Sequence, residues 1–279
     1  MADSPTRLTG LFGHPVAHSK SPQMHNAAFA HLGLQYVYLA FDVLPEQIGA
    51  AVRSISALGL RGVNVTIPHK VAVIPYLDEL SIAAQRIGAV NTIVNEDGRL
   101  IGHNTDGIGY LAALREETGF QAAGRRVLLI GAGGAARAVA TQLALDGAEQ
   151  VTLAVRNVAK AAELLSSLSD ITRADAVTLE DISAQVAEYD LVVNTTPVGM
   201  HPHVEEMPLD PTLLRPGQWV SDLIYNPRQT RFLQEAQALG CLVSGGLGMF
   251  IHQGAEAFRL WTGVSAPTDV MRKTVESCL

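Results

Sequence analysis

Short apolar runs alternate with stretches of helical periodicity in the first third of the chain. This alternation predicts a β-α-β-α order, and Glu96-Asp97-Gly98 predicts a hairpin turn near its end. The expected strands are Leu8–Phe12, Tyr36–Val43, Gly62–Ile67, Ala89–Asn95 and Arg99–His103, and the expected helices are Ser21–Leu32, Pro45–Leu58 and Pro68–Tyr76.

A second series begins with a helical pattern from Gly107 and the fully apolar run Val127–Ile130, which is typical of a strand buried in a parallel sheet. Repeated strand-to-helix crossovers then favour a doubly wound parallel sheet. The further expected strands are Gln150–Val155, Asp190–Asn194 and Trp219–Leu223. One further helix is expected after Gly134, and two more at Ala159–Leu168 and Met249–Thr262.

The two series predict an α/β chain of two domains, since a chain of 279 residues is near the size at which a single core stops growing. We expect one α/β domain from 1–106, completed by C-terminal helices in 246–279. A Rossmann-type doubly wound parallel sheet is expected in 107–245.

Composition excludes several classes of protein. The chain has 20 Lys and Arg against 27 Asp and Glu, a formal charge of −7 and no basic tract, so nucleic acid is not an expected partner. No apolar stretch reaches membrane-spanning length, so no membrane association is expected. The cysteines, Cys241 and Cys278, suit a reducing cytoplasm, and we expect a soluble, unprocessed protein there. The histidine spacings predict no metal site.

A glycine-rich turn gives the clearest chemical signal. Val127–Ile130 runs directly into Gly131-Ala132-Gly133-Gly134-Ala135-Ala136, which matches G-x-G-x-x-A between a strand and a helix. Gly131 would permit the tight turn, and Gly133 would let the backbone approach a pyrophosphate at the helix N-terminus. The turn therefore predicts a dinucleotide site, against the alternative of a plain glycine-rich turn.

The next strand ends in Val155-Arg156-Asn157, where NAD-binding proteins usually carry an acidic residue against the ribose. Arg156 could pair with a 2′-phosphate, and Lys160 would add positive charge. This sequence predicts NADP as the cofactor. The alternative is that Arg156 is a solvated residue at the start of a helix.

Seven distinctive segments follow one another along nearly the whole chain. They are Gly13–Pro22 (GHPVAHSKSP), Asn64–Lys70 (NVTIPHK), Gly88–Thr92 (GAVNT), Asn104–Gly107 (NTDG), Asn194–Met200 (NTTPVGM), Asp222–Pro227 (DLIYNP) and Gly246–Met249 with Gln253. In this order they resemble the motifs of the shikimate dehydrogenase family. The resemblance implies NADPH-dependent reduction of 3-dehydroshikimate to shikimate in the chorismate and aromatic amino acid pathway, with 1–106 and 246–279 binding substrate.

The resemblance implies catalytic roles for Lys70 and Asp106. Lys70 would polarise the ketone and donate a proton, while Asp106 would hold Lys70 and keep it charged. Without the resemblance, each would be interpreted as a solvated charge. The substrate residues that it implies are Ser19, Ser21, Thr66, Lys70, Asn91, Asp106, Tyr225 and Gln253.

Structural alternatives accompany the substrate residues. Ser21 followed by Pro22 is also a common helix start, and Tyr225 could be half-buried packing. The implied cofactor residues extend beyond the glycine-rich turn into neighbouring loops. They are Gly131, Ala132, Gly133, Gly134, Ala135, Val155, Arg156, Asn157, Lys160, Thr196, Leu223, Gly246 and Met249.

The chain departs from the family at Val155-Arg156-Asn157, where many relatives carry Asn-Arg-Thr, which puts strict NADP preference in doubt. An NAD-using quinate/shikimate dehydrogenase is one alternative. A non-catalytic dinucleotide-binding sensor is another, because fold alone does not imply catalysis. A homodimer stays open, because hydrophobicity marks no dimer face.

Overall fold

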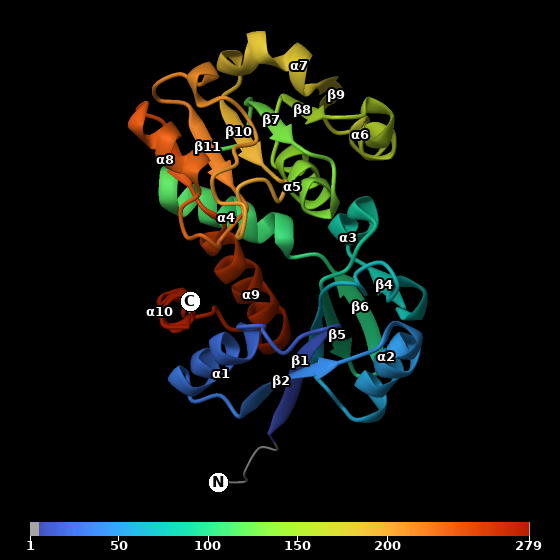
Figure 1. Cartoon of the computed structure of the whole chain (residues 1–279). Helices are drawn as coiled ribbons and strands as arrows, with labels where there is room; N and C mark the ends of the chain where they lie inside the picture. The colour runs from blue at the N-terminus through green and yellow to red at the C-terminus, as the bar shows by residue number, and fades with distance from the viewer. Residues whose placement is uncertain (1–5, 279) are drawn as a thin grey trace. The chain divides into compact units, whose positions relative to one another are not determined.

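This computed structural model describes residues 6–278, which form two compact units. The first unit joins the N-terminal part of the chain, up to Thr105, to the segment from Gln253 onward, and the second runs from Asp106 to His252. The division between the compact units at Gln253 lies inside helix α9 (Gly246–Thr262), and the predicted boundary of the binding domains at residue 246 stays a prediction. Figure 1 shows the elements of both units.

The first unit is built on a six-stranded mixed sheet in the order β2-β1-β3-β5-β6-β4. β1 runs parallel to β2 and β3, while β5 is antiparallel to β3 and β6. Helices α1 and α10 pack together in this unit (Figure 1). Its elements are β1 Arg7–Gly13, α1 Ser21–His31, β2 Tyr36–Asp42, α2 Ile48–Ala57, β3 Gly62–Val65, β4 Glu79–Leu80, α3 Ile82–Ile87, β5 Thr92–Glu96, β6 Arg99–His103 and α10 Thr268–Glu276.

The second unit contains a six-stranded parallel sheet in the order β12-β11-β10-β7-β8-β9. This all-parallel topology confirms the predicted doubly wound sheet. Its elements are α4 Asp106–Thr118, β7 Arg126–Ile130, α5 Gly134–Leu145, β8 Gln150–Val155, α6 Ala162–Leu168, β9 Arg173–Thr178, α7 Leu179–Ile182, β10 Leu191–Asn194, β11 Trp219–Asp222, α8 Arg231–Ala238 and β12 Leu242–Ser244.

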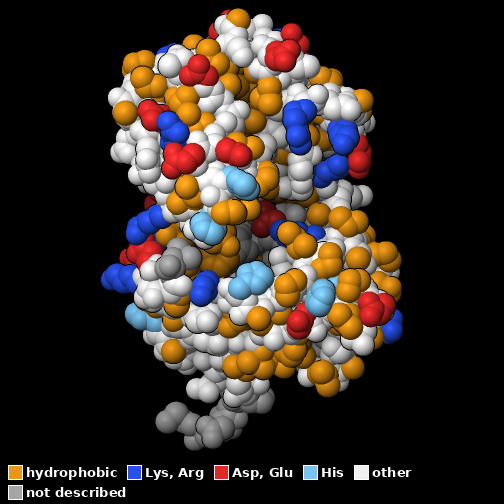
Figure 2. All heavy atoms as spheres, in the orientation of Figure 1, with side chains coloured by type: hydrophobic (Ala, Val, Ile, Leu, Met, Phe, Trp, Pro, Cys, Tyr) orange, Lys and Arg blue, Asp and Glu red, His pale blue; other side chains and the backbone are white. Residues whose placement is uncertain are grey.

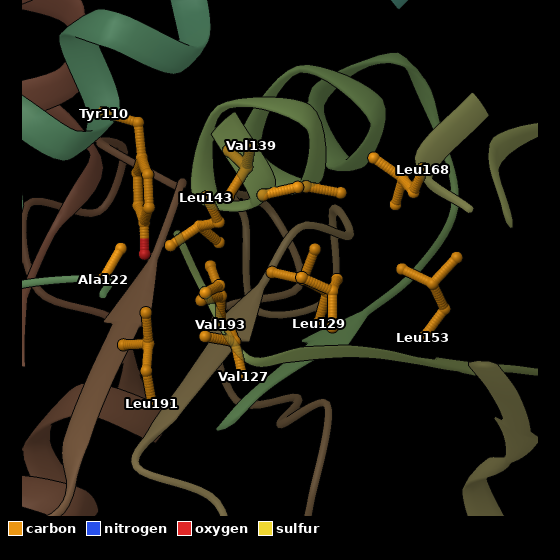
Figure 3. Packing of buried hydrophobic residues seen from close by; sticks show 14 of the residues in the cluster. Tyr110, Ala122, Val127, Leu129, Val139, Leu143, Leu153, Leu168, Leu191 and Val193 are labelled. Atoms are coloured by element: carbon orange, nitrogen blue, oxygen red, sulfur yellow. The ribbon is translucent and has the colours of Figure 1, made fainter. Parts of the chain in front are cut away.

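Strand β7 explains why this sheet needs helices on both faces. Val127 and Leu129 belong to one buried cluster, together with Val139 and Leu143 of α5, as Figure 3 shows. Leu128 and Ile130 point to the other face and belong to a second cluster. Because successive side chains of a strand alternate between faces, the continuous apolar run requires burial on both sides.

The helix expected at Pro68–Tyr76 is wrong for most of its length. The chain forms turns through this segment, and only Ile74–Tyr76 forms a short 3₁₀ helix. Pro75 has no N–H for a helical hydrogen bond and restricts the preceding residue, so a helix across this segment is disfavoured. The strand expected at Gly62–Ile67 likewise ends at Val65, before Pro68.

Candidate active site

Several loops of the first unit start or end at one edge of its sheet. β1 ends at Gly13 and β3 at Val65, while β5, which runs the opposite way, begins at Thr92 beside His103 at the end of β6. We call this edge, where β1, β2, β3 and β6 end and β5 begins, the substrate edge. It gathers the predicted residues Ser19, Ser21, Thr66, Lys70 and Asn91.

The two predicted serines lie on either side of the start of α1. The backbone N–H of Ser21 donates to Ser19 Oγ at 3.3 Å, and Ser21 is 7% exposed. The alternative that Ser21 caps the helix is wrong, because Lys20 occupies the N-cap position and Ser21 is the first helical residue. The Ser21 hydroxyl is therefore not used for capping.

The backbone around Lys70 is fixed from several sides. The Thr66 N–H donates to the Phe12 carbonyl at 2.9 Å, and the Val90 N–H donates to the Lys70 carbonyl at 2.8 Å. The buried ring of His69 donates through Nε2 to the Val43 carbonyl at 2.7 Å. These bonds connect the backbone around Lys70 to β1, to the residue after β2 and to the residues that precede β5. The Lys70 side chain itself is half-buried.

Asn91 has a structural task as well as its predicted role toward substrate. Its Nδ2 donates to Thr105 Oγ1 at 3.0 Å, and its Oδ1 accepts from the Thr105 N–H at 2.8 Å. Asp106, which follows Thr105, is the first residue of α4. The amide of Asn91 thus anchors the segment that leads directly into Asp106.

Three predicted substrate residues lie away from these loops in the sequence. Asp106 and Tyr225 belong to the second unit, and Gln253 is the first residue of the C-terminal part of the first unit. Tyr225 is 43% exposed, although its ring lies 5.7 Å from that of Phe250, so the alternative that it is half-buried packing is wrong. The pairing of Lys70 with Asp106 joins residues of different units and stays a prediction.

In the second unit, the glycine-rich turn lies at the end of β7. Gly131 has φ +110°, and a Cβ there would lie 2.7 Å from Thr195 Oγ1. A side chain at this position would therefore be strained and would collide with the neighbouring loop. This observation agrees with the tight-turn role expected of Gly131.

Gly133 and Gly134 face open space, since a Cβ at either would meet no atom within 4 Å. Gly133 is the N-cap of α5 and supplies no side-chain bond, and the first turn of this 12-residue helix has no acidic residue. Its N-terminal N–H groups and the helix dipole favour an anion. The turn, including Ala132 and Ala135, therefore fits the pyrophosphate of a dinucleotide.

The end of β8 carries the predicted phosphate-binding residues. Val155 is buried, whereas Arg156, Asn157 and Lys160 are exposed. The Asn157 side chain accepts from the Ala159 N–H at 3.0 Å and caps the short helix that follows. No carboxylate occupies this strand end, so its charge fits a 2′-phosphate.

A buried carboxylate holds the neighbouring loops together. Asp222, at the end of β11, accepts from Asn194 Nδ2 at 3.1 Å, from Thr230 Oγ1 at 2.9 Å and from the Ile224 N–H at 3.0 Å. Asn194 Oδ1 in turn accepts from Thr196 Oγ1 at 2.7 Å. Burial raises the pKa of Asp222, and these hydrogen bonds oppose the rise.

The remaining predicted cofactor residues gather beside the same sheet. Ala132, Leu223 and Met249 all pack against the apolar cluster under α5. The backbone of Gly246 packs directly against that of Leu223, since a Cβ at Gly246 would lie 2.1 Å from the Leu223 carbonyl oxygen. The structure thus brings the second unit's predicted cofactor residues to the carboxyl ends of β7, β8, β10 and β11, which we call the cofactor edge.

Sequence reasoning did not single out the buried polar residues that support these loops. Asn64, Thr105, Asn194 and Asp222 are nearly inaccessible and hydrogen-bonded to segments carrying predicted site residues. All of them stand within the family-like segments quoted above. These supporting residues could have been found in the sequence as polar residues that lie inside an apolar strand or directly after one.

On the face drawn in Figure 2, Lys and Arg side chains are interspersed with Asp and Glu among hydrophobic ones. Within residues 6–278, no group of three His, Cys, Asp or Glu side chains could hold a metal ion. No helix in that same range has the length and apolarity needed to cross a membrane.

Family models match three parts of the chain. Residues 11–93 match the shikimate dehydrogenase substrate binding domain, and residues 113–213 match shikimate / quinate 5-dehydrogenase. Residues 246–276 match the shikimate 5′-dehydrogenase C-terminal domain. The matches include the ends of β1, β2 and β3 at the substrate edge and the ends of β7, β8 and β10 at the cofactor edge.

Known proteins resemble the chain over nearly its full length. A shikimate dehydrogenase (NADP(+)) of Geobacillus kaustophilus is 51% identical, covering 98% of this chain and 99% of the relative. The shikimate 5-dehydrogenase of Thermus thermophilus, solved with NADP(H) and shikimate, is 41% identical with a TM-score of 0.87, covering 98% of this chain and 100% of that one. Quinate dehydrogenase of Corynebacterium glutamicum, solved with NAD, is 34% identical with a TM-score of 0.90 and the same coverage. The chain belongs to the shikimate dehydrogenase family.

Proposed function

We propose that this chain catalyses the reversible reduction of 3-dehydroshikimate to shikimate with NADPH, a step of chorismate and aromatic amino acid biosynthesis. The observation that carries the proposal is that each unit presents a matching residue set at one sheet edge. Lys70 and the serines lie at the substrate edge, and the Gly131 turn lies at the cofactor edge. The 51% identity to an NADP-dependent relative over 98% of the chain supports it.

Lys70 is the proposed acid–base group. Hydrogen bonds fix the backbone of Lys70 and of the residues before it. The ammonium group can therefore move only through rotation of the Lys70 side chain. A cation beside the ketone oxygen stabilises the negative charge that develops there, and it can donate the proton that completes the alcohol. In the reverse direction, the neutral amine accepts that proton.

Asp106 is the proposed partner of Lys70. It begins α4 directly after Thr105, which Asn91 anchors. A carboxylate near the lysine would favour its charged form and accept a hydrogen bond from a ring hydroxyl. Ser19 and Ser21 would donate to the substrate carboxylate, and Thr66, Asn91, Tyr225 and Gln253 would bind elsewhere on the substrate.

NADPH, when bound, supplies the hydride. The N–H groups at the start of α5 would hold its pyrophosphate, and Arg156 with Lys160 would bind the 2′-phosphate. Thr196, Leu223, Gly246 and Met249 would line the nicotinamide end. We accordingly assign cofactor binding to 107–245 and substrate binding to 1–106 with 246–279, and we place the enzyme in the cytoplasm. One chain supplies every residue of the scheme, so a homodimer is not required.

Initial rates of shikimate and quinate oxidation, each with NADP and with NAD, test this function. Purified protein is assayed at neutral pH by nicotinamide absorbance. The expected result is that shikimate with NADP gives the highest kcat/KM of the four pairs. Absence of turnover in every assay would contradict the proposal and favour the non-catalytic sensor.

A second candidate is an NAD-using quinate/shikimate dehydrogenase. The structural likeness to a quinate dehydrogenase solved with NAD, at a TM-score of 0.90, favours considering it. Arg156 and the missing carboxylate at the end of β8 argue against NAD. Quinate with NAD as the best pair would establish this candidate instead.

A further inference from the structure

A relay of buried hydrogen bonds lies at the substrate edge, and the proposed mechanism does not use the threonine at its centre. Asn64 on β3 lies directly opposite Thr92, the first residue of β5, in the antiparallel ladder. Residues directly opposite one another carry their side chains on the same face of the sheet, close enough to bond. Asn64 Nδ2 accordingly donates to Thr92 Oγ1 at 3.0 Å, and both side chains are buried.

The relay begins at the phenol of Tyr38 on β2. Its buried ring is stacked on that of His25, with 4.5 Å between the ring centroids, and its hydroxyl lies 2.8 Å from Asn64 Oδ1. Asn64 Nδ2 also donates to the Asn91 carbonyl at 3.2 Å. Because a carbonyl only accepts, the orientation of the Asn64 amide is settled. Tyr38 therefore donates to Asn64, and Asn64 donates to Thr92.

The proton of the Thr92 hydroxyl is directed to the side chain of Asn91. Thr92 Oγ1 lies 3.1 Å from Asn91 Oδ1, whereas its contact with Thr105 Oγ1 is longer, at 3.5 Å. Asn91 Oδ1 also accepts from the Thr105 backbone N–H at 2.8 Å. Because a backbone N–H only donates, the orientation of the Asn91 amide is settled as well. Thr92 is therefore the donor to Asn91 Oδ1.

These directions decide what the Asn91 amide can offer to a substrate. Its oxygen accepts from both the Thr92 hydroxyl and the Thr105 N–H. An inverted amide would set N–H against N–H in a buried position, where an unsatisfied polar group is costly. One N–H of Asn91 Nδ2 donates to Thr105 Oγ1 at 3.0 Å, and the second N–H is the donor that the amide can direct to a substrate oxygen.

We propose that Thr92 is a positioning residue of the substrate site, whose hydroxyl holds the Asn91 amide so that Nδ2 donates to one ring hydroxyl of the substrate. The inference rests on the proposed function, in which Asn91 binds the substrate. Thr92 is 0% exposed, so it acts through Asn91 and does not touch substrate. The bond from Asn64 occupies the Thr92 oxygen as an acceptor and keeps the Thr92 proton directed to Asn91.

Thr92→Val removes the hydroxyl and keeps a β-branched side chain that suits a strand. We expect the KM for shikimate to rise about 10-fold, because the Asn91 amide loses one of the donors that hold its buried oxygen. The kcat and the KM for NADP should change by less than about twofold, since a bond to a ring hydroxyl that does not react contributes equally to the ground state and the transition state.

Thr9→Val is the matched control in the same sheet. Thr9 on β1 is also 0% exposed, and its hydroxyl donates to the Val37 carbonyl at 3.0 Å, which is not part of the relay. Both variants should have a lower melting temperature than the unaltered protein, but only Thr92→Val should raise the KM for shikimate. A lowered melting temperature with an unchanged KM in Thr92→Val would mean that Thr92 serves stability alone, and would overturn the inference.

Shikimate analogues that each lack one ring hydroxyl separate positioning from a general loss of structure. Their dissociation constants are measured by competition with shikimate in the oxidation assay. Thr92→Val should weaken the binding of these analogues about 10-fold, except for the one that lacks the hydroxyl bound by Asn91, whose constant should not change. An equal loss for every analogue would overturn the inference alone. An unaltered protein without turnover would instead overturn the proposed function, and this inference with it.

Discussion

The two units hold polar groups at their sheet edges in different ways. At the substrate edge, neutral amides and hydroxyls such as Asn64, Asn91 and Thr105 bond to one another in buried positions. At the cofactor edge, the backbone at Gly133 and Gly134 is left open, and the buried carboxylate of Asp222 holds the adjacent loops together. A side-chain network suits a polyhydroxylated ring, and an open backbone suits a phosphate.

The buried titratable groups differ in the same way. Among residues 6–278, His25 in the first unit has no hydrogen-bond partner, and burial lowers its pKa to about 3. Asp222 in the second unit is surrounded by donors, although burial still raises its pKa. The buried histidine of the first unit is kept neutral by its apolar surroundings. The buried carboxyl group of the second unit is instead surrounded by hydrogen-bond donors. The following experiments test this division.

The largest expected effect comes from Lys70→Ala, which should remove chemistry and leave cofactor binding. We expect kcat to fall about 10³-fold, within the range that general acid–base groups contribute. NADPH affinity, measured by fluorescence titration, should be unchanged, because Lys70 lies in the first unit. Lys273→Ala, an exposed lysine on α10 of the same unit, is the control. Near-normal turnover would remove Lys70 from the mechanism.

Gly131→Ala should produce the reverse pattern. A residue with a Cβ at φ +110°, with Thr195 Oγ1 at 2.7 Å, costs about 1–3 kcal/mol, so NADP affinity should weaken roughly 10- to 100-fold. Gly147→Ala is matched in backbone sign, with φ +86°, but its Cβ would meet nothing closer than 3.6 Å. Equal loss of NADP affinity in both variants would mean that strain alone, and not the turn, is responsible.

Arg156→Asp should change which cofactor the second unit prefers. Loss of charge-assisted hydrogen bonds costs about 1.5–3 kcal/mol, so the NADP dissociation constant should rise about 10- to 100-fold. NAD binding should weaken far less. Arg173→Asp makes the same charge change at the start of β9, at the opposite end of the sheet. An unchanged preference would assign the phosphate to another residue.

The smallest effect is a difference in acid sensitivity. The folded-state pKa of His25 lies below its unfolded value of 6.5, so the stability linked to its neutral ring is complete above pH 6.5 and declines as pH falls toward about 3. The expected slope is about 1.4 kcal/mol per pH unit at most.

Urea unfolding of a Trp219→Phe variant leaves Trp261 to report on the first unit, where it contacts His25. His25→Phe should make the free energy of unfolding depend less on pH between pH 6.5 and 5. If the free energy of unfolding depends on pH equally with and without His25, this histidine is not the source of the acid sensitivity.

Asp222 has the opposite effect on the pH dependence of stability. A raised carboxyl pKa means that stability declines as pH rises through that pKa.

Much of the fold could be predicted because its strands are unambiguous. The run at Val127–Ile130 and the strand at Gln150–Val155 have the apolar character of a parallel sheet, and both are confirmed. Short elements had no such signal: β4 has two residues, α3 has six, and neither was predicted. Periodicity needs a window longer than these segments.

The sequence predicted which residues belong to the candidate site, but it could not predict which residues contact one another there. Family-like segments identified Lys70 and Asn91, the glycine-rich motif identified Gly131, and the structure places each at a sheet edge. The sequence could not show that Asn91 anchors Thr105, or that Tyr38 on β2 donates to Asn64 on β3. Such contacts depend on strand order and register, which are properties of the folded chain.

Because the first unit is discontinuous, the order of synthesis matters for how the chain folds. The ribosome releases all of the second unit before the helical segments that complete the first one. Until then, His25 and Tyr38 lack Trp261, whose Nε1 donates to Ile93 at 3.1 Å, and α1 lacks α10. The aromatic cluster of the N-terminal segment therefore lacks its C-terminal cover through most of translation, and such uncovered apolar surface favours aggregation before folding is complete.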